Sequence, residues 1–178
     1  TTRSRRTATP PLNSSVRPLM SLPTVDELVA LYSQVKGGDV GHAEHRLFQQ
    51  HGLAPLIPLV ASAYLRIRRG SGRARILFWL PRYARVRQDV VSLALSALSD
   101  RSYIVREYAC SILAYSLRPD VIPQLTSLQV HPDPKTRAAA AAAIDAISSK
   151  NHHYFVDRKH SGSTFWSVNR GDVPGRSF

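Results

Sequence analysis

A repeat with a period of 31 residues is the feature of this chain that most constrains its fold. Arg75, Arg106 and Arg137 follow one another at this interval, which also separates Asp89-Val90-Val91 from Asp120-Val121-Ile122. Each unit predicts an apolar helix after the arginine, a short turn, and a second apolar helix with the aspartate as its N-cap. Because one helical hairpin cannot bury its apolar face alone, we expect the hairpins to stack into a right-handed α-solenoid.

Helices are predicted along most of the chain, which places it in the all-α class. Thr24 and Glu27 form a capping box at the start of the first helix, and Gly37-Gly38 ends that helix. Further helices are predicted at 42–50, 54–67, 75–80, 89–98, 105–117, 120–128 and 135–147. Together they predict one helical repeat domain over residues 23–150.

An aspartate precedes the repeated arginine in two of the units. Asp133 lies four residues before Arg137, with alanines after the arginine, and Asp100 lies six residues before Arg106. This arrangement resembles the HEAT-like repeats, of the kind found in phycobilisome-lyase-like proteins, over residues 70–150. We expect the arginines to pair with loop aspartates of their own or the adjacent repeat. Such repeats serve many roles, so the resemblance implies a scaffold and no single activity.

The two ends of the chain have different patterns. Residues 1–22 are rich in Thr, Ser, Pro and Arg, which predicts a disordered basic arm, although Met20 is also a candidate start of the natural protein. Aromatic and β-branched residues on both sides of Gly162 predict a β-hairpin cap at 151–169, followed by a flexible tail at 170–178. We expect Phe165 and Trp166 to cover the apolar face of the last repeat.

The composition narrows the class of protein. A hydrophobic content of 43% excludes a wholly disordered chain, and no apolar run is long enough to cross a membrane. Cys110 is the only cysteine, so no disulfide can form within the chain. Residues 1–10 have no apolar segment behind them and do not form a secretory signal, so we expect a cytoplasmic protein. The net charge of +12 favours an acidic partner.

The densest run of positive charge spans residues 66–87. Aromatic residues, including Tyr83, lie among its arginines, a combination that suits phosphate backbones and stacked bases. The candidate binding residues are Arg66, Arg68, Arg69, Arg73, Arg82, Arg85, Arg87 and Tyr83. HEAT-like DNA glycosylases use a basic face of this general sort, which keeps nucleic-acid binding or base repair open. An acidic protein surface and a merely solvated face are the other two interpretations.

Nothing in the sequence requires an enzyme. It contains no phosphate-binding loop, no dinucleotide fingerprint and no nucleophile elbow, so we predict no catalytic residue and no cofactor. His152, His153, Asp157 and His160 lie near the predicted hairpin, but their spacing matches no standard zinc site, and no metal site is predicted. The favoured function is a non-catalytic scaffold that recognises a protein, as an adaptor or as an inhibitor of the immunity type. The sequence leaves the oligomeric state open.

Overall fold

The computed structural model describes residues 21–34 and 39–172, and within them it contains helices and no strand. The α-helices are α1 (Val25–Ser33), α2 (Asp39–His51), α3 (Ile57–Tyr64), α4 (Gly70–Phe78), α5 (Gln88–Ala97), α6 (Tyr103–Ser116), α7 (Ile122–Ser127) and α8 (Pro134–Ser148). Short 3-10 helices form η1 (Ala54–Leu56), η2 (Pro81–Tyr83), η3 (Pro119–Val121), η4 (Leu128–Val130), η5 (His152–Phe155) and η6 (Arg170–Asp172). The prediction of an all-α chain is confirmed.

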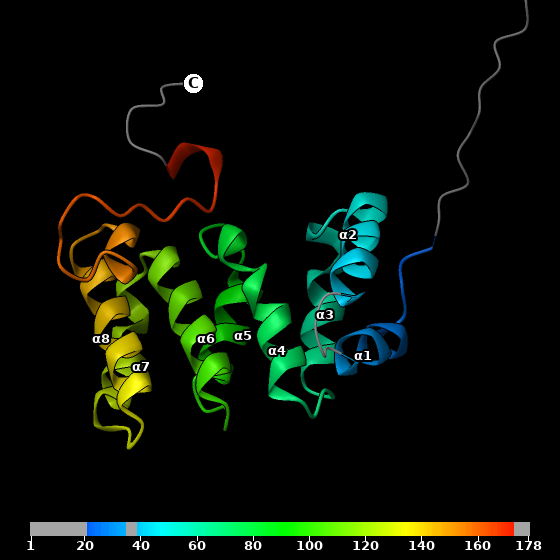
Figure 1. Cartoon of the computed structure of the whole chain (residues 1–178), viewed down its shortest axis with the longest axis horizontal. Helices are drawn as coiled ribbons and strands as arrows, with labels where there is room; N and C mark the ends of the chain where they lie inside the picture. The colour runs from blue at the N-terminus through cyan, green and yellow to red at the C-terminus, as the bar shows by residue number, and fades with distance from the viewer. Residues whose placement is uncertain (1–20, 35–38, 173–178) are drawn as a thin grey trace, which may run out of the picture.

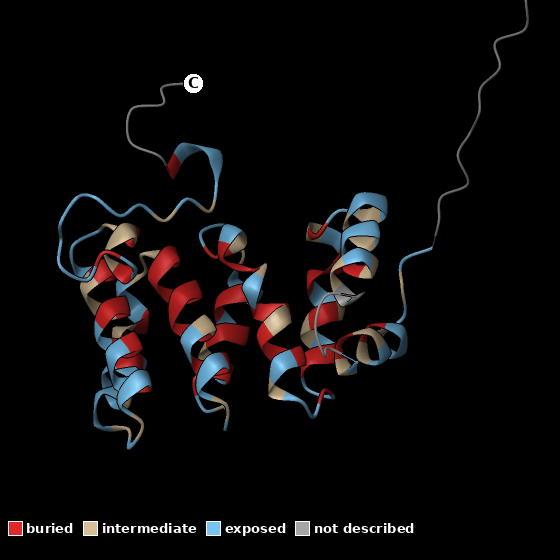
Figure 2. Cartoon of the chain, in the orientation of Figure 1, coloured by how far each residue is buried: buried red, intermediate tan, exposed pale blue. Residues whose placement is uncertain are grey.

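The helices stack in two layers as a short solenoid. Helices α4, α6 and α8 stand side by side, with α6 packed between the other two, and α3, α5 and α7 contribute the second layer (Figure 1). Buried residues run through the stack from α1 to α8, so the hairpins share one continuous core (Figure 2). Stacking of this kind is the expected solution for hairpins with one apolar face each.

Local sequence signals explain where several helices begin. The hydroxyl of Thr24 accepts from the amide of Glu27, and the Glu27 carboxylate accepts from the Thr24 amide, so the predicted capping box begins α1. Asp133 caps α8 by accepting from the amides of Lys135 and Thr136. Asp89 and Asp120 do not cap their helices as predicted, because their carboxylates are turned toward Arg87 and Arg118.

Small residues allow helices to approach closely at two places. A Cβ atom on Gly72 would lie 2.2 Å from the carbonyl oxygen of Tyr32, so α4 can meet α1 only with glycine there. In the run of alanines at 138–143, Ala139, Ala140 and Ala143 are almost fully buried where α8 packs on α6. The last repeat is therefore joined to the core through small side chains.

The predicted β-hairpin cap is wrong. After η5, residues 156–172, which we call the strap, run back from α8 across the ends of the neighbouring helices to η6 (Figure 1). Phe165 is half exposed, and Trp166 packs against Tyr115 of α6 and Phe155 of η5. The aromatic pair therefore contacts α6 and η5 without forming a second strand.

Side chains supply the hydrogen bonds that a partner strand would otherwise provide. The Asp157 carboxylate accepts from the amides of Ser161 and Gly162, and His153 Nδ1 accepts from the amide of Trp166. Farther along, the Asp172 carboxylate accepts from the amides of residues 168 and 169, at 2.9 and 2.7 Å. A backbone amide in a folded protein needs a hydrogen-bond acceptor. Here carboxylates and an imidazole accept from the strap amides in place of the carbonyl oxygens of a neighbouring β-strand.

The ends of the chain only partly fall within the described residues. The predicted arm lies outside them except for residues 21 and 22, both exposed, and the predicted tail lies outside them from residue 173 onward. Residues 170–172, which were placed in the tail, form η6 and bury the side chain of Asp172. Among the described residues, no helix has the length and apolar character to cross a membrane.

Candidate functional site

Helices α4, α6 and α8 form one layer of the solenoid, which we call the front layer. Each of these helices has an arginine at its fourth position. Arg73, Arg106 and Arg137 are the fourth residues of α4, α6 and α8, and each donates to the carbonyl oxygen six residues before it. Arg106 also donates to Asp133 at 3.0 Å, and Arg73 donates to both carboxylate oxygens of Asp100 at 2.6 and 2.8 Å. In each case the aspartate precedes the next helix of the layer, so the arginine joins two repeats.

The structure thus makes Arg73, and not Arg75, the counterpart of Arg106. The interval between equivalent arginines is 33 residues from Arg73 to Arg106 and 31 residues from Arg106 to Arg137.

The hydroxyl of Thr136 is the main group that lowers the pKa of Asp133, to about 2. In the part of the chain that the structure describes, Arg137 has no acidic partner, because no further repeat follows α8.

Arg75 has a separate structural role. Its Nε donates to Glu44 of α2 at 2.7 Å, and the hydroxyl of Tyr32 donates to the other carboxylate oxygen at 2.9 Å. Glu44 is fully buried, so Arg75 compensates a charge that has no access to water. Burial, with the nearby Glu44 charge, raises the pKa of Tyr32, which keeps its hydroxyl protonated as the donor.

The basic stretch at 66–87 does not form one surface. Five of its arginines are in ion pairs: Arg66 with Asp26, Arg73 with Asp100, Arg75 with Glu44, Arg85 with Asp172, and Arg87 with Asp89. Arg68 and Arg69 precede α4 and Arg82 follows it, so these three exposed arginines lie at opposite ends of one helix. Tyr83 is partly buried against the core. The structure therefore divides the predicted binding residues between the two edges of the solenoid.

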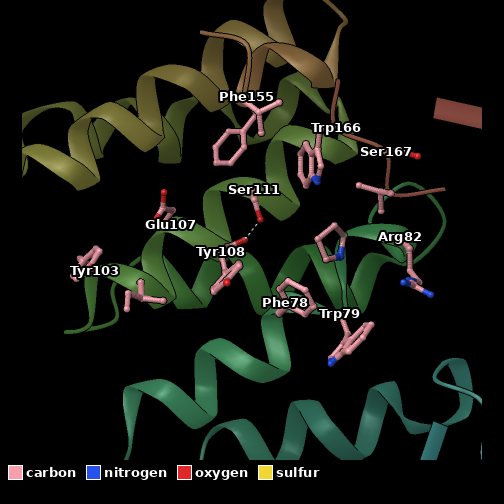
Figure 3. Close-up of a pocket in the computed structure, with 14 residues that line it drawn as sticks. Phe78, Trp79, Arg82, Tyr103, Glu107, Tyr108, Ser111, Phe155, Trp166 and Ser167 are labelled. Atoms are coloured by element: carbon pink, nitrogen blue, oxygen red, sulfur yellow. Dashed lines mark hydrogen bonds between the residues drawn. The ribbon is translucent and has the colours of Figure 1, made fainter. Parts of the chain in front are cut away.

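A groove lined by aromatic side chains crosses the exposed side of α6. No pattern in the sequence indicated this groove. It has a volume of about 570 Å³ and lies between the end of α4, the exposed side of α6, and the strap (Figure 3). The residues that line it are Phe78, Trp79, Pro81, Arg82, Tyr103, Ile104, Glu107, Tyr108, Ser111, Phe155, Val156, Trp166, Ser167 and Val168. This volume is within the usual range for small-molecule pockets.

Large apolar side chains remain accessible along the groove. Phe78 is 45% exposed, Val156 is 41%, and Tyr103 and Ile104 are each 39% exposed. Phe78 packs edge-on against Trp79 and Tyr108, so the aromatic lining is held in place by its own contacts. Isolated exposed apolar residues are ordinary, whereas this set is gathered in one groove, and large exposed apolar patches are typical of interaction surfaces.

Charged and polar groups are few in the groove. Glu107 is its one acidic residue, and Arg82, which lies over the ring of Trp79, is its one basic residue. Among the described residues, Arg82 has no acidic partner, and the buried indole nitrogen of Trp79 has no hydrogen-bond acceptor. Figure 3 shows that this nitrogen is directed away from Trp166. The groove therefore has an apolar lining with a free guanidinium at one end.

A buried polar network holds the strap that forms one wall of the groove. His152 contacts the carbonyl oxygen of Trp166 through Nε2 at 2.9 Å and Arg85 through Nδ1 at 3.2 Å. Because a carbonyl only accepts and a guanidinium only donates, the imidazole is the neutral tautomer with its proton on Nε2. Burial is the main cause that lowers the pKa of His152 below its usual value. Tyr115 donates to Asp172 at 2.9 Å and so holds the far end of the strap.

The other candidate groups have structural partners. His153 accepts from the Trp166 amide, and His160 lies 2.6 Å from the Asp145 carboxylate. The described residues include no cluster of three His, Cys, Asp or Glu side chains that could hold a metal. Cys110 is buried in α6, and burial raises the pKa of its thiol to about 12, so it remains an uncharged packing group.

Comparison with protein families agrees with the helical architecture. Residues 91–152, from α5 to the start of η5, match the family model described as HEAT repeats, which supports a HEAT-like repeat family. The match covers about a third of the chain. Neither the curated proteins nor the solved structures gave a significant match.

Proposed function

We propose that this chain is a non-catalytic HEAT-like scaffold that binds a protein partner in the groove across α6. The observation that carries the proposal is the groove itself, with accessible aromatic and aliphatic side chains contributed by α4, α6 and the strap. HEAT repeats commonly mediate protein interactions, and the match over 91–152 includes α6. Adaptor and inhibitor roles both follow from binding of this kind.

The occupant that fits the groove best is a short apolar segment of the partner with an acidic residue beside it. Aromatic walls suit large apolar side chains, which supply most of the binding free energy in protein interfaces. The free guanidinium of Arg82 favours a carboxylate at its end of the groove, and the net charge of +12 attracts acidic partners generally.

Nucleic-acid binding or base repair through the whole stretch 66–87 has weaker support. Five of the eight arginines in that stretch are already in ion pairs within the chain. Asp89, the acidic residue that follows this stretch, accepts from Arg87 at 2.9 Å, so its carboxylate is already paired within the chain.

A displayed library of random peptides, selected on the full chain, tests the groove. We expect the selected peptides to be rich in aromatic and acidic residues and to bind Val156→Asp much more weakly, because that change places a carboxylate inside the groove. Val130→Asp is the matched control, since Val130 is 86% exposed on η4, outside the groove. Peptides that bind Val156→Asp as tightly as the unchanged chain, or no selected peptides at all, contradict the proposal.

A further inference from the structure

The loops that precede the three front helices all lie at one edge of the solenoid. Helices α4, α6 and α8 point in the same direction, so their N-terminal ends share the lower edge in Figure 1. Apart from Arg66, which is paired with Asp26, five exposed cations lie in these loops and first turns, and we call them the basic edge: Arg68, Arg69, Arg101, Lys135 and Arg137. Within the described residues none of the five has an acidic partner.

The aspartates in the same loops are turned inward, where the buried arginines of the preceding helices bind them. Asp100 pairs with Arg73 and has 8% of its side chain exposed, and Asp133 pairs with Arg106 and has 26% exposed. The negative charge of each loop is thus neutralised from within, while the positive charge of the loop faces water. The positive ends of three helix dipoles add to the same potential.

The opposite edge has a different arrangement. There Asp89 and Asp120 are exposed beside their arginine partners, with 42% and 59% of their side chains accessible. Exposed pairs of opposite sign cancel much of each other's field. Among the described residues, Arg82 has no acidic partner on this edge either, but Arg87 and Arg118 each lie beside an exposed aspartate, so the cations at the start of α5 and α7 do not form a row without counter-charges.

Contacts between repeats hold part of the basic edge in a row. Arg101, in the loop before α6, donates to the carbonyl oxygen of Arg68 in the loop before α4, at 2.8 Å. Lys135 of α8 lies over the ring of Tyr103 of α6, with its nitrogen 4.6 Å from the ring centre. Arg101 and Lys135 are thus each held against the preceding repeat. This restraint reduces the side-chain entropy that is lost when the basic edge binds a ligand.

We propose that the basic edge binds the phosphate backbone of a nucleic acid. Packed helices repeat at about 8–10 Å, so the solenoid presents its cations at regular steps along a line. A linear polyanion with evenly spaced charges matches such a row, and arginine, which contributes four of the five cations, suits phosphate oxygens. The basic edge meets the groove at Tyr103, whose ring lines the groove and lies under Lys135, while the strap side of the groove is formed by other residues.

Fluorescence anisotropy with a labelled DNA duplex, recorded over a series of salt concentrations, tests the basic edge. We expect the full chain to bind at low salt and to lose affinity steeply as salt rises, because each phosphate contact releases counterions. Lys135→Glu should weaken binding about tenfold at about 0.1 M salt and lower the slope of the log–log plot by about one. The change should leave the fold intact, since a carboxylate in the first turn of α8 suits the helix dipole.

Lys159→Glu is the matched control. Lys159 is also an exposed lysine, but it lies on the strap, and its substitution changes the net charge by the same amount. Both variants keep the arginines of residues 1–20, so any contribution of that segment cancels in the comparison. We expect Lys159→Glu to bind within about twofold of the unchanged chain.

Three results would overturn the proposal. The first is no binding of duplex DNA or RNA at low salt, and the second is equal weakening by Lys135→Glu and Lys159→Glu, which would reflect overall charge alone. The third is displacement of the duplex by polyglutamate at equal charge concentration, which would assign the edge to acidic proteins. The Val156→Asp variant should bind the duplex as tightly as the unchanged chain does. The test of the basic edge therefore does not depend on whether the groove proposal is correct.

Discussion

Arg106 of α6 donates from Nη2 to the carboxylate of Asp133 at the start of α8, a distance of 3.0 Å, and so joins one repeat to the next. The same side chain donates to Thr136, and its buried position leaves it little access to water. Arg73 and Asp100 form the equivalent link one repeat earlier. The series ends at Arg137, which has no aspartate partner among the described residues and donates to the carbonyl oxygens of His131 and Pro132.

Loss of Arg73 should destabilise the protein strongly. The Arg73→Leu change leaves the Asp100 carboxylate, with 8% of its side chain exposed, without its cation, and breaking such a pair costs about 3 kcal/mol. Arg137→Leu is the matched control and should change the free energy of unfolding by no more than about 0.5 kcal/mol. Urea denaturation measures both changes, and equal effects would contradict the link between repeats.

The pair of Arg75 and Glu44 should behave as one unit. Arg75→Leu alone leaves a fully buried carboxylate unpaired and should cost about 3 kcal/mol. In a Glu44→Gln background the same change should cost less than about 1 kcal/mol, because the amide oxygen can still accept from Tyr32 without carrying a charge. A double-mutant cycle in urea gives the coupling, and additive effects would refute it.

Trp166 should contribute to stability as a packing residue. Trp166→Ala removes the ring that contacts Tyr115, His152 and Phe155, and because this ring is only partly buried we expect a loss of about 2 kcal/mol, below the value for a full core tryptophan. Phe165→Ala, at a half-exposed position, should cost less than about 1 kcal/mol. Thermal unfolding compares them, and an unchanged melting temperature in Trp166→Ala would assign that ring to ligand binding.

Acidification should loosen the strap through His152. The folded pKa lies below the unfolded value of 6.5, mainly because of burial, so the unfolded or released state binds the proton more readily. The stability of the strap is therefore complete above pH 6.5 and is lost as the pH falls below that value. Protonation also places an N–H on Nδ1 against Arg85, and the nearby Asp172, 3.9 Å from Nε2, only partly offsets this.

Fluorescence in a Trp79→Phe background follows this transition, because Trp166 is then the only tryptophan. We expect its emission to shift to longer wavelength as the pH falls below 6.5, well before global unfolding. His152→Gln should remove this early transition, since glutamine has no proton to gain. If the same shift persists in His152→Gln, another group controls the strap.

Much of the helical framework followed from sequence alone, because its signals are local. The Thr24 capping box, the small residues at 138–143 and the repeated arginines each act within a few residues or one helical face. Such signals indicate where a helix begins and which side is apolar. They also predicted an all-α stack of hairpins in place of a membrane or mixed fold.

The sequence did not reveal which arginine joins the repeats. Counting back 31 residues from Arg106 leads to Arg75, but the first interval in the structure is 33 residues and leads to Arg73. The two arginines lie two positions apart on α4, so they point to different neighbours, Asp100 and Glu44. Loop length between helices varies without disturbing the stack, and the period therefore does not fix the register.

Tertiary structure alone decided the strap and the groove. The residues after η5 have the composition of strands, but Asp157, His153 and Asp172 accept hydrogen bonds from the strap amides, which leaves no ladder to form. The groove brings residues 78 and 168 to one surface, although 90 residues separate them in the chain. Helix formation depends on neighbours within one or two turns, whereas a groove depends on which distant side chains meet after packing, and no local pattern in the sequence records that meeting.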